Sequence, residues 1–247
     1  MLFFFLGTII GSFLNVVIIR IPNNQSIIYP RSHCPKCQKK IPFYYNIPIL
    51  SFIILKGKCF NCNEKISQQY ILVETLTGIL FYIIFSLFPL DQAGLLAIVF
   101  SVLIILSVID IYHLLIHVYL IAILYISIIL KIFIYNETIL ETLFGSLATV
   151  LYLAIPCILI IIIKKNKSVL GFGDILLSAF IGGWMGAING ILCLFLASTI
   201  GISFFLYSII INKRESVLKI PFGACISIAF IIIVIIEKYY NFKLFTF

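Results

Sequence analysis

Long apolar runs alternate with short polar loops along most of the chain. A run of roughly 18 or more apolar residues can cross a bilayer as a helix. The sequence places such segments at 1–19, 70–89, 94–112, 114–135, 141–163, 174–188, 190–211 and 220–236. The 174–188 segment is short, and a tight turn near His113 and a boundary near Gly190 separate neighbouring segments. This pattern predicts an all-α polytopic membrane protein with about eight transmembrane helices.

One polar block, residues 20–69, interrupts the apolar pattern directly after the first segment. It contains five of the prolines: Pro22, Pro30, Pro35, Pro42 and Pro48. Proline removes a backbone donor and breaks regular structure, so loops and short turns are expected here. The chain is therefore divided into a first transmembrane helix (1–19), a cytosolic block (20–69) and a transmembrane domain (70–247).

The distribution of charge sets the expected orientation in the membrane. Cytoplasmic loops carry an excess of Lys and Arg. With the N-terminus outside, the inside loops hold all but three of the 17 basic residues: Arg20, Arg31, Lys36, Lys39, Lys40, Lys56, Lys58, Lys65, Lys164, Lys165, Lys167, Lys213, Arg214 and Lys219. Lys131, Lys238 and Lys243 remain for the other side. We expect both termini outside and the polar block in the cytoplasm.

Composition supports this interpretation and argues against nucleic-acid binding. The chain is 63% hydrophobic and 11% charged, whereas soluble domains carry about 25% charged residues. Its mean hydropathy is +1.22. The net charge of +8 comes from loop residues between apolar runs, which serve orientation and attraction to anionic lipid. Membrane lipid is therefore an expected partner, and nucleic acid is not.

Two glycine patterns predict close helix packing. Gly7 and Gly11 have G-x-x-x-G spacing in the first segment, and Gly182, Gly186 and Gly190 repeat the small-residue spacing further along. Small residues let helix backbones approach each other closely. The second pattern is compatible with internal packing and with a dimer.

Two aspartates are the candidate catalytic residues. Asp110 ends the third apolar segment and Asp174 opens the sixth, so the charge argument places both at the cytoplasmic face. An ionisable residue in a membrane segment is a candidate functional site. Two neighbouring carboxylates can share a proton, so that one activates water while the other polarises a carbonyl. The alternative is that Asp174 only caps a helix and Asp110 only lies at an interface.

The glycines flanking Asp174 suit such a site. Gly171 and Gly173 would let a substrate backbone approach and would permit unusual backbone dihedral angles at a helix start. The helix N-terminus would also favour a charged carboxylate at Asp174. Glu74, near the same face, is interpreted as a residue that pairs with a basic side chain or contacts substrate.

Four cysteines in the polar block predict a metal site. Cys34 and Cys37 form one C-x-x-C pair, and Cys59 and Cys62 form another, with 21 residues between the pairs. Such pairs bind tetrahedral zinc, and a cytosolic location disfavours disulfides. Four thiolates leave no open position, so the zinc is expected to be structural; reduced unmetallated pairs or a redox pair are the alternatives. The histidines at 33, 113 and 117 are not needed as ligands.

Taken together, the motifs resemble those of the type 4 prepilin peptidases, bifunctional leader peptidases and N-methyltransferases of the bacterial inner membrane. The similarity covers nearly the whole chain: Gly11-Ser12-Phe13-Leu14-Asn15-Val16-Val17, Arg20, Pro22, Arg31-Ser32-His33-Cys34-Pro35, Cys37, Tyr45-Asn46-Ile47-Pro48, Ser51, Gly57, Cys59, Cys62, Ile66-Ser67, Tyr70, Glu74, Gly171-Phe172-Gly173-Asp174 and Ile220-Pro221-Phe222-Gly223.

The resemblance implies a GxGD-type membrane aspartic peptidase with Asp110 and Asp174 as its catalytic aspartates. The implied substrates are type IV prepilin or pseudopilin precursors, of pili, type II secretion or competence systems. Their basic leader would be cleaved after a glycine at the cytoplasmic face. S-adenosylmethionine would then methylate the new N-terminus; our hypothesis places the methyl donor near Asn15, Arg20 and Tyr45-Asn46.

One departure from the family pattern concerns residues after the third segment. Positions that are often acidic in the family are Tyr112 and His117 here. Asp110 is thus the acid that remains, and a role for further acids in substrate contact is in doubt. A peptidase without methyltransferase activity and, more remotely, a small ion-coupled transporter remain as alternatives.

Overall fold

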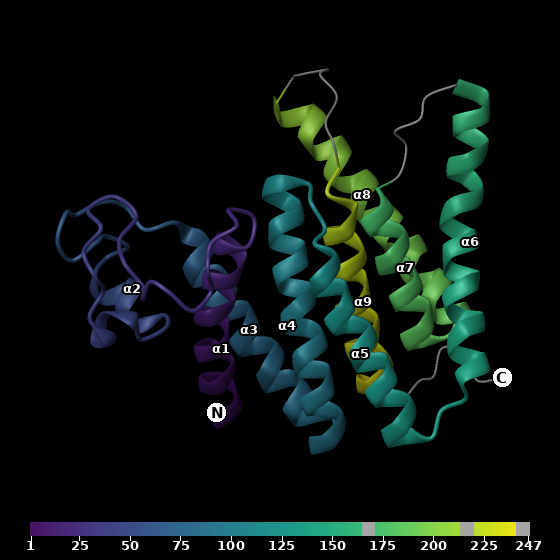
Figure 1. The fold of residues 1–247 in the computed structure, drawn as a ribbon, viewed down its shortest axis with the longest axis horizontal. Helices are drawn as coiled ribbons and strands as arrows, with labels where there is room; N and C mark the ends of the chain where they lie inside the picture. The colour runs from purple at the N-terminus through teal and green to yellow at the C-terminus, as the bar shows by residue number, and fades with distance from the viewer. Residues whose placement is uncertain (165–170, 213–219, 241–247) are drawn as a thin grey trace. The chain divides into compact units, whose positions relative to one another are not determined.

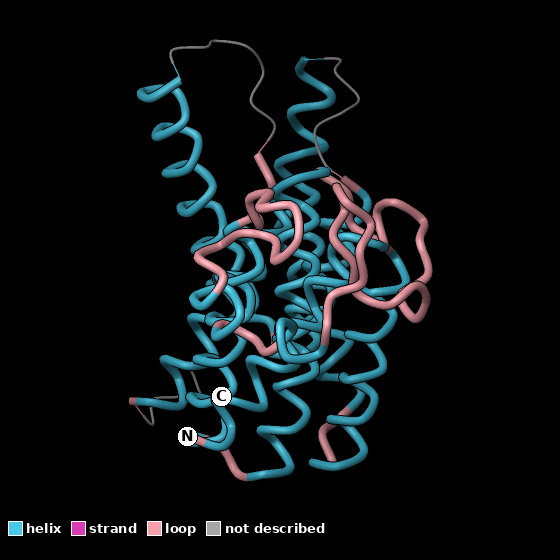
Figure 2. Tube along the Cα trace, turned by 90° about the vertical axis from the view of Figure 1, so that its left-hand side faces the viewer, coloured by secondary structure: helices cyan, strands magenta, loops and turns pink. Residues whose placement is uncertain are grey.

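The computed structural model describes residues 1–164, 171–212 and 220–240. Within these ranges the chain forms helices and loops, and Figure 2 shows no strand. The helices are α1 (Leu2–Arg20), η1 (Phe43–Asn46), α2 (Leu50–Ile54), α3 (Gln68–Leu87), α4 (Leu90–His113), α5 (Val118–Tyr135), α6 (Ile139–Lys164), α7 (Phe172–Met185), α8 (Ala187–Asn212) and α9 (Phe222–Tyr239). The predicted all-α class is confirmed.

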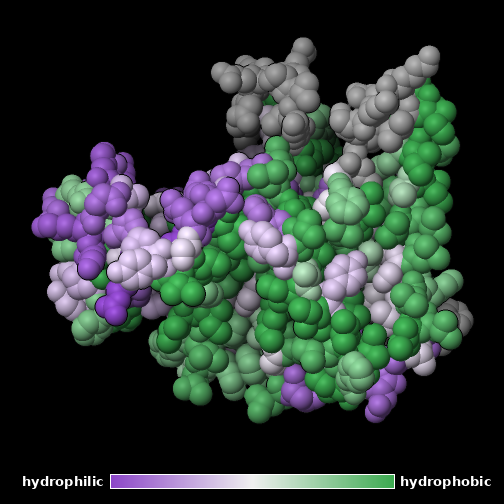
Figure 3. Space-filling model, viewed as in Figure 1, coloured by the Kyte–Doolittle hydropathy of each residue, from purple (hydrophilic) through white to green (hydrophobic). Residues whose placement is uncertain are grey.

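Seven described helices are long and apolar enough to cross a membrane: α1, α3, α4, α5, α6, α8 and α9. The eighth expected span, α7, is an apolar helix of 14 residues. At 1.5 Å per residue it is about 21 Å long, which is less than the roughly 30 Å of a hydrocarbon core. The helices present mostly hydrophobic residues, and the hydrophilic ones gather over the cysteine block (Figure 3). The chain is a multi-pass membrane protein.

The structure divides into two compact units, residues 1–105 and 106–247, with the boundary inside α4. The sequence division into 1–19, 20–69 and 70–247 stays a prediction. Several basic residues of the expected inside loops lie outside the described part of the chain, or have side chains that do: Lys164, Lys165, Lys167, Lys213, Arg214 and Lys219.

In the first unit, α1 packs tightly on α3. A Cβ atom added at Gly7 would lie 2.7 Å from the Thr77 carbonyl oxygen, and one at Gly11 would lie 2.8 Å from the Glu74 Cα atom. Contacts this short leave no space for a side chain, so the close packing predicted from G-x-x-x-G is confirmed. The polar block connects the two helices and contains only the short elements η1 and α2, as expected.

In the second unit, glycines bring α6 and α7 into backbone contact. A Cβ atom at Gly145 would lie 3.0 Å from the Gly182 carbonyl carbon, and the two glycines exclude side chains from each other's position. Thr149 reinforces the crossing, because its hydroxyl donates to the Ser178 carbonyl at 2.8 Å. Gly190 also lies close to Gly182, with 3.0 Å between an added Cβ and the Gly182 Cα. The small-residue spacing therefore serves internal packing.

The boundary between the sixth and seventh apolar segments differs from the expected one. The chain turns at Gly186, which has a φ of +81°, and α8 begins at Ala187. The expected boundary near Gly190 was wrong by a turn, because only the backbone conformation distinguishes a turning glycine from a packing glycine. Glycine adopts a positive φ without steric cost, which favours this residue at position 186.

Helices α5, α7 and α9 lie side by side in the second unit (Figure 1), and Phe180 of α7 contacts rings of both neighbours. Phe180, Trp184 and Phe230 form an aromatic cluster with ring centroids 5.8–6.3 Å apart. The Tyr125 hydroxyl donates to the Leu176 carbonyl at 3.1 Å, which joins α5 to α7. Lys131 donates to the Trp184 carbonyl at 2.8 Å near the C-terminal ends of the same two helices. These contacts fix the axial position of α7.

Candidate active site and cysteine cluster

Asp110 lies in the last turn of α4 and is only 5% exposed. Its carboxylate oxygen Oδ2 accepts a hydrogen bond of 3.0 Å from the backbone N–H of Ala224, in the first turn of α9. The N–H of Gly223 interacts with the same carboxylate. A residue 114 positions away in sequence thus holds this aspartate.

Asp174 is the third residue of α7, whose N-cap is Gly171. The Asp174 carboxylate folds back toward this cap: its Oδ2 is 3.0 Å from the place a Gly171 Cβ would occupy. The Gly171 N–H interacts with the carboxylate. A side chain at this helix position that reaches back to the N-cap N–H follows the geometry of a capping box.

The two glycines near Asp174 have ordinary backbone conformations. Gly171 has a φ of −76°, which any residue can adopt, and Gly173 is not among the described glycines with positive φ. The unusual dihedral angles that glycine would permit are therefore not used at these two positions. What Gly173 provides is space, because an added Cβ would lie 2.5 Å from the Ile116 Cβ. Access for a substrate backbone stays a prediction.

Ile116, in the loop between α4 and α5, packs against the two helix starts that lie beside the aspartates. It contacts Gly173 at the start of α7 and would lie 2.8 Å from a Cβ added at Gly223, at the start of α9. The end of α4 and the starts of α7 and α9 therefore meet at one end of the second unit (Figure 1). The carboxylates of Asp110 and Asp174 are near enough to interact electrostatically. They stay a predicted acid–base pair.

The residues at the family's other acidic positions lie at the end of α4 and in the loop before α5. Tyr112 is 63% exposed. His117 is the N-cap of α5, and its Nδ1 atom is buried without a hydrogen-bond partner among the described residues. Burial, and to a smaller extent the nearby His113, lower the pKa of His117. The ring is therefore neutral near pH 7 and does not replace the charge of an acid.

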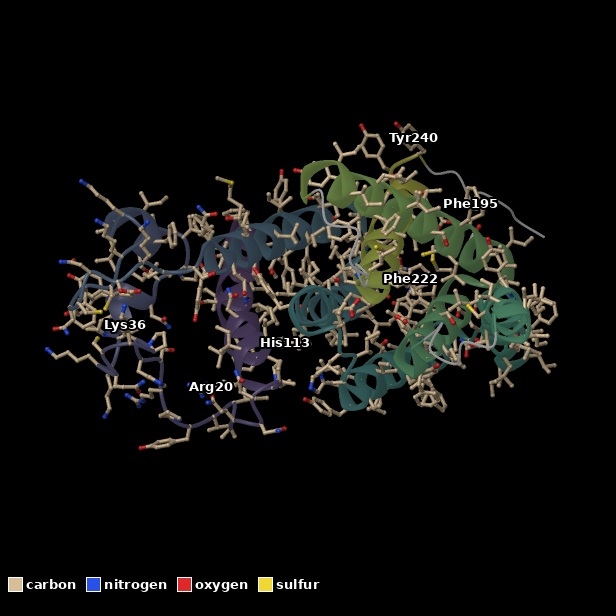
Figure 4. The ribbon with its side chains drawn as sticks, turned by 90° about the horizontal axis from the view of Figure 1, so that it is seen from above. Arg20, Lys36, His113, Phe195, Phe222 and Tyr240 are labelled. Carbon is tan, nitrogen blue, oxygen red and sulfur yellow. The ribbon has the colours of Figure 1, made fainter. Side chains whose placement is uncertain are left out.

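The sequence analysis assigned no role to the start of α9, although its backbone contacts Asp110. Phe222, labelled in Figure 4, is the first residue of α9, and Pro221 is its N-cap. The signal was the proline and glycine directly before an apolar run, which is typical of a helix start. Sequence spacing alone does not reveal that this helix start faces Asp110.

In the first unit, the four cysteines of the polar block form one cluster. Their Sγ atoms all lie within 4.8 Å of one another, and those of Cys34 and Cys62 are 3.8 Å apart. All four are free thiols and form no disulfide. A tetrahedron with metal–sulfur bonds of about 2.3 Å has edges of about 3.8 Å. The donor set therefore fits a metal ion.

Each C-x-x-C pair has the same local geometry. The N–H of Gln38 donates to the Cys34 carbonyl, and the N–H of Asn63 donates to the Cys59 carbonyl, at 2.9 and 3.1 Å. Gln38 and Asn63 both have positive φ, 58° and 57°. Backbone N–H groups of Cys62 and Asn61 lower the pKa of the Cys59 thiol to about 7. The block is thus two matching knuckles that present thiols to one point.

Polar side chains at the ends of α1 and α3 bind backbone. The Arg20 guanidinium donates to the carbonyls of Ser26, Ile27 and Pro30 at 2.8, 3.2 and 2.5 Å. Asn15 donates to the Tyr70 carbonyl at 3.1 Å. The methyl-donor site near these residues stays a prediction.

Glu74 also has a backbone partner. It accepts a hydrogen bond of 2.8 Å from the N–H of Ile49, whose φ is +62°. This bond ties the segment before α2 to α3, so Glu74 anchors the polar block. It makes no ion pair with a basic side chain among the described residues.

These features define a class: a helical multi-pass membrane protein with two aspartates at one end of a helix bundle and a four-thiol cluster. Family models identify the chain further. Residues 5–88 match the bacterial peptidase A24 N-terminal domain, and residues 97–206 match the type IV leader peptidase family. The first match contains all four clustered cysteines, and the second contains both aspartates.

Curated relatives agree along nearly the full length. The chain is 34% identical to the type 4 prepilin-like proteins leader peptide-processing enzyme of Escherichia coli O78:H11, over 90% of this chain and 88% of that one. It is 34% identical to the prepilin leader peptidase/N-methyltransferase of Vibrio cholerae, over 94% of both chains. No solved structure matches the chain. The chain belongs to the type 4 prepilin peptidase family.

Proposed function

We propose that this protein cleaves the leader peptide of type IV prepilin-like precursors and methylates the new N-terminus. Family membership supports both activities, because the relatives are named leader peptidase and N-methyltransferase. The observation that supports the peptidase half is that Ile116 packs against the starts of both α7 and α9, beside Asp174 and Asp110, whose carboxylates interact electrostatically. The family assignment sets aside the transporter alternative.

In this proposal the two aspartates share one proton. The ionised carboxylate takes a proton from a water molecule, whose oxygen attacks the scissile carbonyl carbon, while the protonated carboxyl donates to the carbonyl oxygen. The tetrahedral intermediate then collapses, and its departing amine takes a proton. The products are a leader ending in a carboxylate and a mature pilin with a free amine, which is the acceptor for the methyl group.

The proposed membrane orientation follows from charge. Basic residues of the polar block lie between α1 and α3, and the positive-inside rule places such loops in the cytoplasm. A basic leader peptide stays on the same side, so its junction with an apolar helix lies at the cytoplasmic face. We propose the bacterial inner membrane as the location and a cleavage site after the leader's terminal glycine.

Two cofactors belong to the proposal. Cys34, Cys37, Cys59 and Cys62 would hold a zinc ion, which would supply a cross-link between the two knuckles and no open position for catalysis. S-adenosylmethionine would be the methyl donor. Tyr45, which stacks with Phe60 at a centroid distance of 5.4 Å, remains in the region proposed for it.

The decisive experiment uses purified protein in nanodiscs with a prepilin substrate. Asp110→Asn and Asp174→Asn should each lower the cleavage rate about 10²–10⁴-fold, because each removes one acid–base group. Glu141→Gln, an exposed acid in the first turn of α6, is the control and should cleave normally. Normal cleavage by either aspartate variant would show that the dyad assignment is wrong.

Methylation is measured in the same reactions by mass spectrometry. With S-adenosylmethionine present, the mature pilin should gain one methyl group at its N-terminus. Cleavage without this gain identifies the protein as a peptidase that does not methylate. Both aspartate variants should still methylate a pilin supplied without its leader.

A further inference from the structure

Burying the Asp110 carboxylate at the C-terminal end of α4 has an electrostatic cost that other groups must offset. The C-terminal end of a helix carries partial negative charge, which disfavours an anion in its last turn. Asp110 is in that turn and is 5% exposed, so water stabilises its carboxylate little. A group elsewhere in the fold must supply hydrogen bonds and positive potential.

The start of α9 supplies both. The first N–H groups of a helix have no partner within the helix and carry partial positive charge. In α9 the Cys225 N–H donates to the Pro221 carbonyl at 3.3 Å, which begins the backbone bonding of the helix. The two N–H groups before it, of Gly223 and Ala224, point to the Asp110 carboxylate instead.

The lack of a side chain at position 223 makes this approach possible. A Cβ atom there would lie 3.1 Å from Asp110 Oδ2 and 2.8 Å from Ile116 Cδ1. The same Ile116 side chain contacts Gly173 beside Asp174. The α9 start, Ile116 and the α7 start therefore form one continuous set of contacts around the two carboxylates.

We propose that the start of α9, Pro221–Ala224, is a positioning element of the peptidase site. Its Gly223 and Ala224 N–H groups hold the Asp110 carboxylate beside Ile116, whose side chain also packs against the start of α7. Pro221 lacks an N–H and sets where the helix begins, and Gly223 provides the space. This inference rests on the proposed function, since it assigns α9 a role in the cleavage step.

The experiment replaces one backbone N–H by oxygen. An amide-to-ester change at Ala224, with lactate in place of alanine, removes the donor to Asp110 and keeps the methyl side chain. The same change at Ala229 is the matched control: it is a buried alanine of α9, in the interior of the helix and away from its start. Both proteins are made as full chains and reconstituted in nanodiscs.

The ester at 224 should lower kcat for cleavage about 10–100-fold, the usual effect of losing a bond that orients a functional group. The KM for prepilin should stay within about threefold, and methylation of a leaderless pilin should be unchanged. The ester at 229 should keep kcat within about threefold, although it also loses a backbone hydrogen bond. Equal kcat losses in the two proteins, or an unchanged kcat at 224, would overturn the proposal.

A genetically encoded pair gives an independent measurement. Gly223→Ala should lower kcat at least tenfold, because the added methyl group pushes against Asp110 and Ile116. Gly201→Ala is the control, since its Cβ would meet only Ile220 and Cys225 atoms at 3.6 and 3.7 Å. Equal rates for the two variants argue against the proposal. A fully active Asp110→Asn enzyme would instead contradict the proposed dyad itself, so the two failures are distinguishable.

Discussion

The contact between α6 and α7 predicts that one methyl group will disturb the site. In Gly145→Ala, the new Cβ would lie 3.0 Å from the Gly182 carbonyl carbon and 3.1 Å from the Gly186 carbonyl carbon. Unstrained carbon atoms lie about 3.5–4.0 Å apart, so the helices must separate by roughly 0.5 Å or more. The neighbours are backbone atoms of a packed helix and cannot rotate away.

Overpacking of this kind costs about 1–3 kcal/mol. A loss of about 2 kcal/mol lowers Tm by roughly 4–8 °C for a chain of this size. Helix α7 carries Asp174, and a displacement near 1 Å can reduce a rate about 100-fold. We therefore expect Gly145→Ala to lower both Tm and the rate of prepilin cleavage, the latter by roughly tenfold or more.

Thermal unfolding in detergent, followed by tryptophan fluorescence, and cleavage kinetics in nanodiscs measure the two effects. Gly94→Ala is the control, because no heavy atom lies within 4 Å of its added Cβ. Alanine is also the better helix former, so this variant should melt at or above the wild-type temperature. A Gly145→Ala protein that melts as high as the wild type and cleaves at full rate would refute the packing argument.

Two further predictions concern the cysteine cluster and the α6–α7 hydrogen bond. Cys59→Ser should reduce bound zinc, measured by elemental analysis, from about one ion per chain to none, because structural sites need all four ligands. Cys157→Ser, outside the cluster, is the control and should keep the ion. A zinc-free wild type would contradict the assignment. Thr149→Val should lower stability by about 1 kcal/mol, because it removes the hydroxyl hydrogen bond from α6 to the Ser178 carbonyl of α7. Ser203→Ala, an exposed hydroxyl on α8, should have little effect on Tm.

Local features of the chain were predictable because their causes are local. Apolar run length predicts a membrane helix, since a bilayer admits few other structures. The G-x-x-x-G spacing at Gly7 and Gly11 predicts close packing, because small residues let any two helix backbones approach each other. The two C-x-x-C pairs bring their own turn geometry, so their convergence on one point follows from ligand chemistry.

Features that depend on the folded path of the backbone were not predictable. The role of Arg20 was interpreted as orientation charge, yet its guanidinium binds three backbone carbonyls of the following loop. The turn at Gly186 was placed at Gly190, because both glycines continue one small-residue spacing. In each case the residue type allowed several structures, and its neighbours in space selected one.

The two aspartates show most clearly which features the sequence predicts and which ones only the tertiary structure reveals. Sequence alone determined that Asp110 and Asp174 lie at ends of apolar helices, because apolar run length needs no knowledge of the fold, and the charge distribution predicts one membrane face for both. Only the packed structure decided that the start of α9 faces Asp110, across 114 positions of sequence. The physical reason is that a hydrogen bond to a carboxylate depends on where helices meet, which no local pattern encodes.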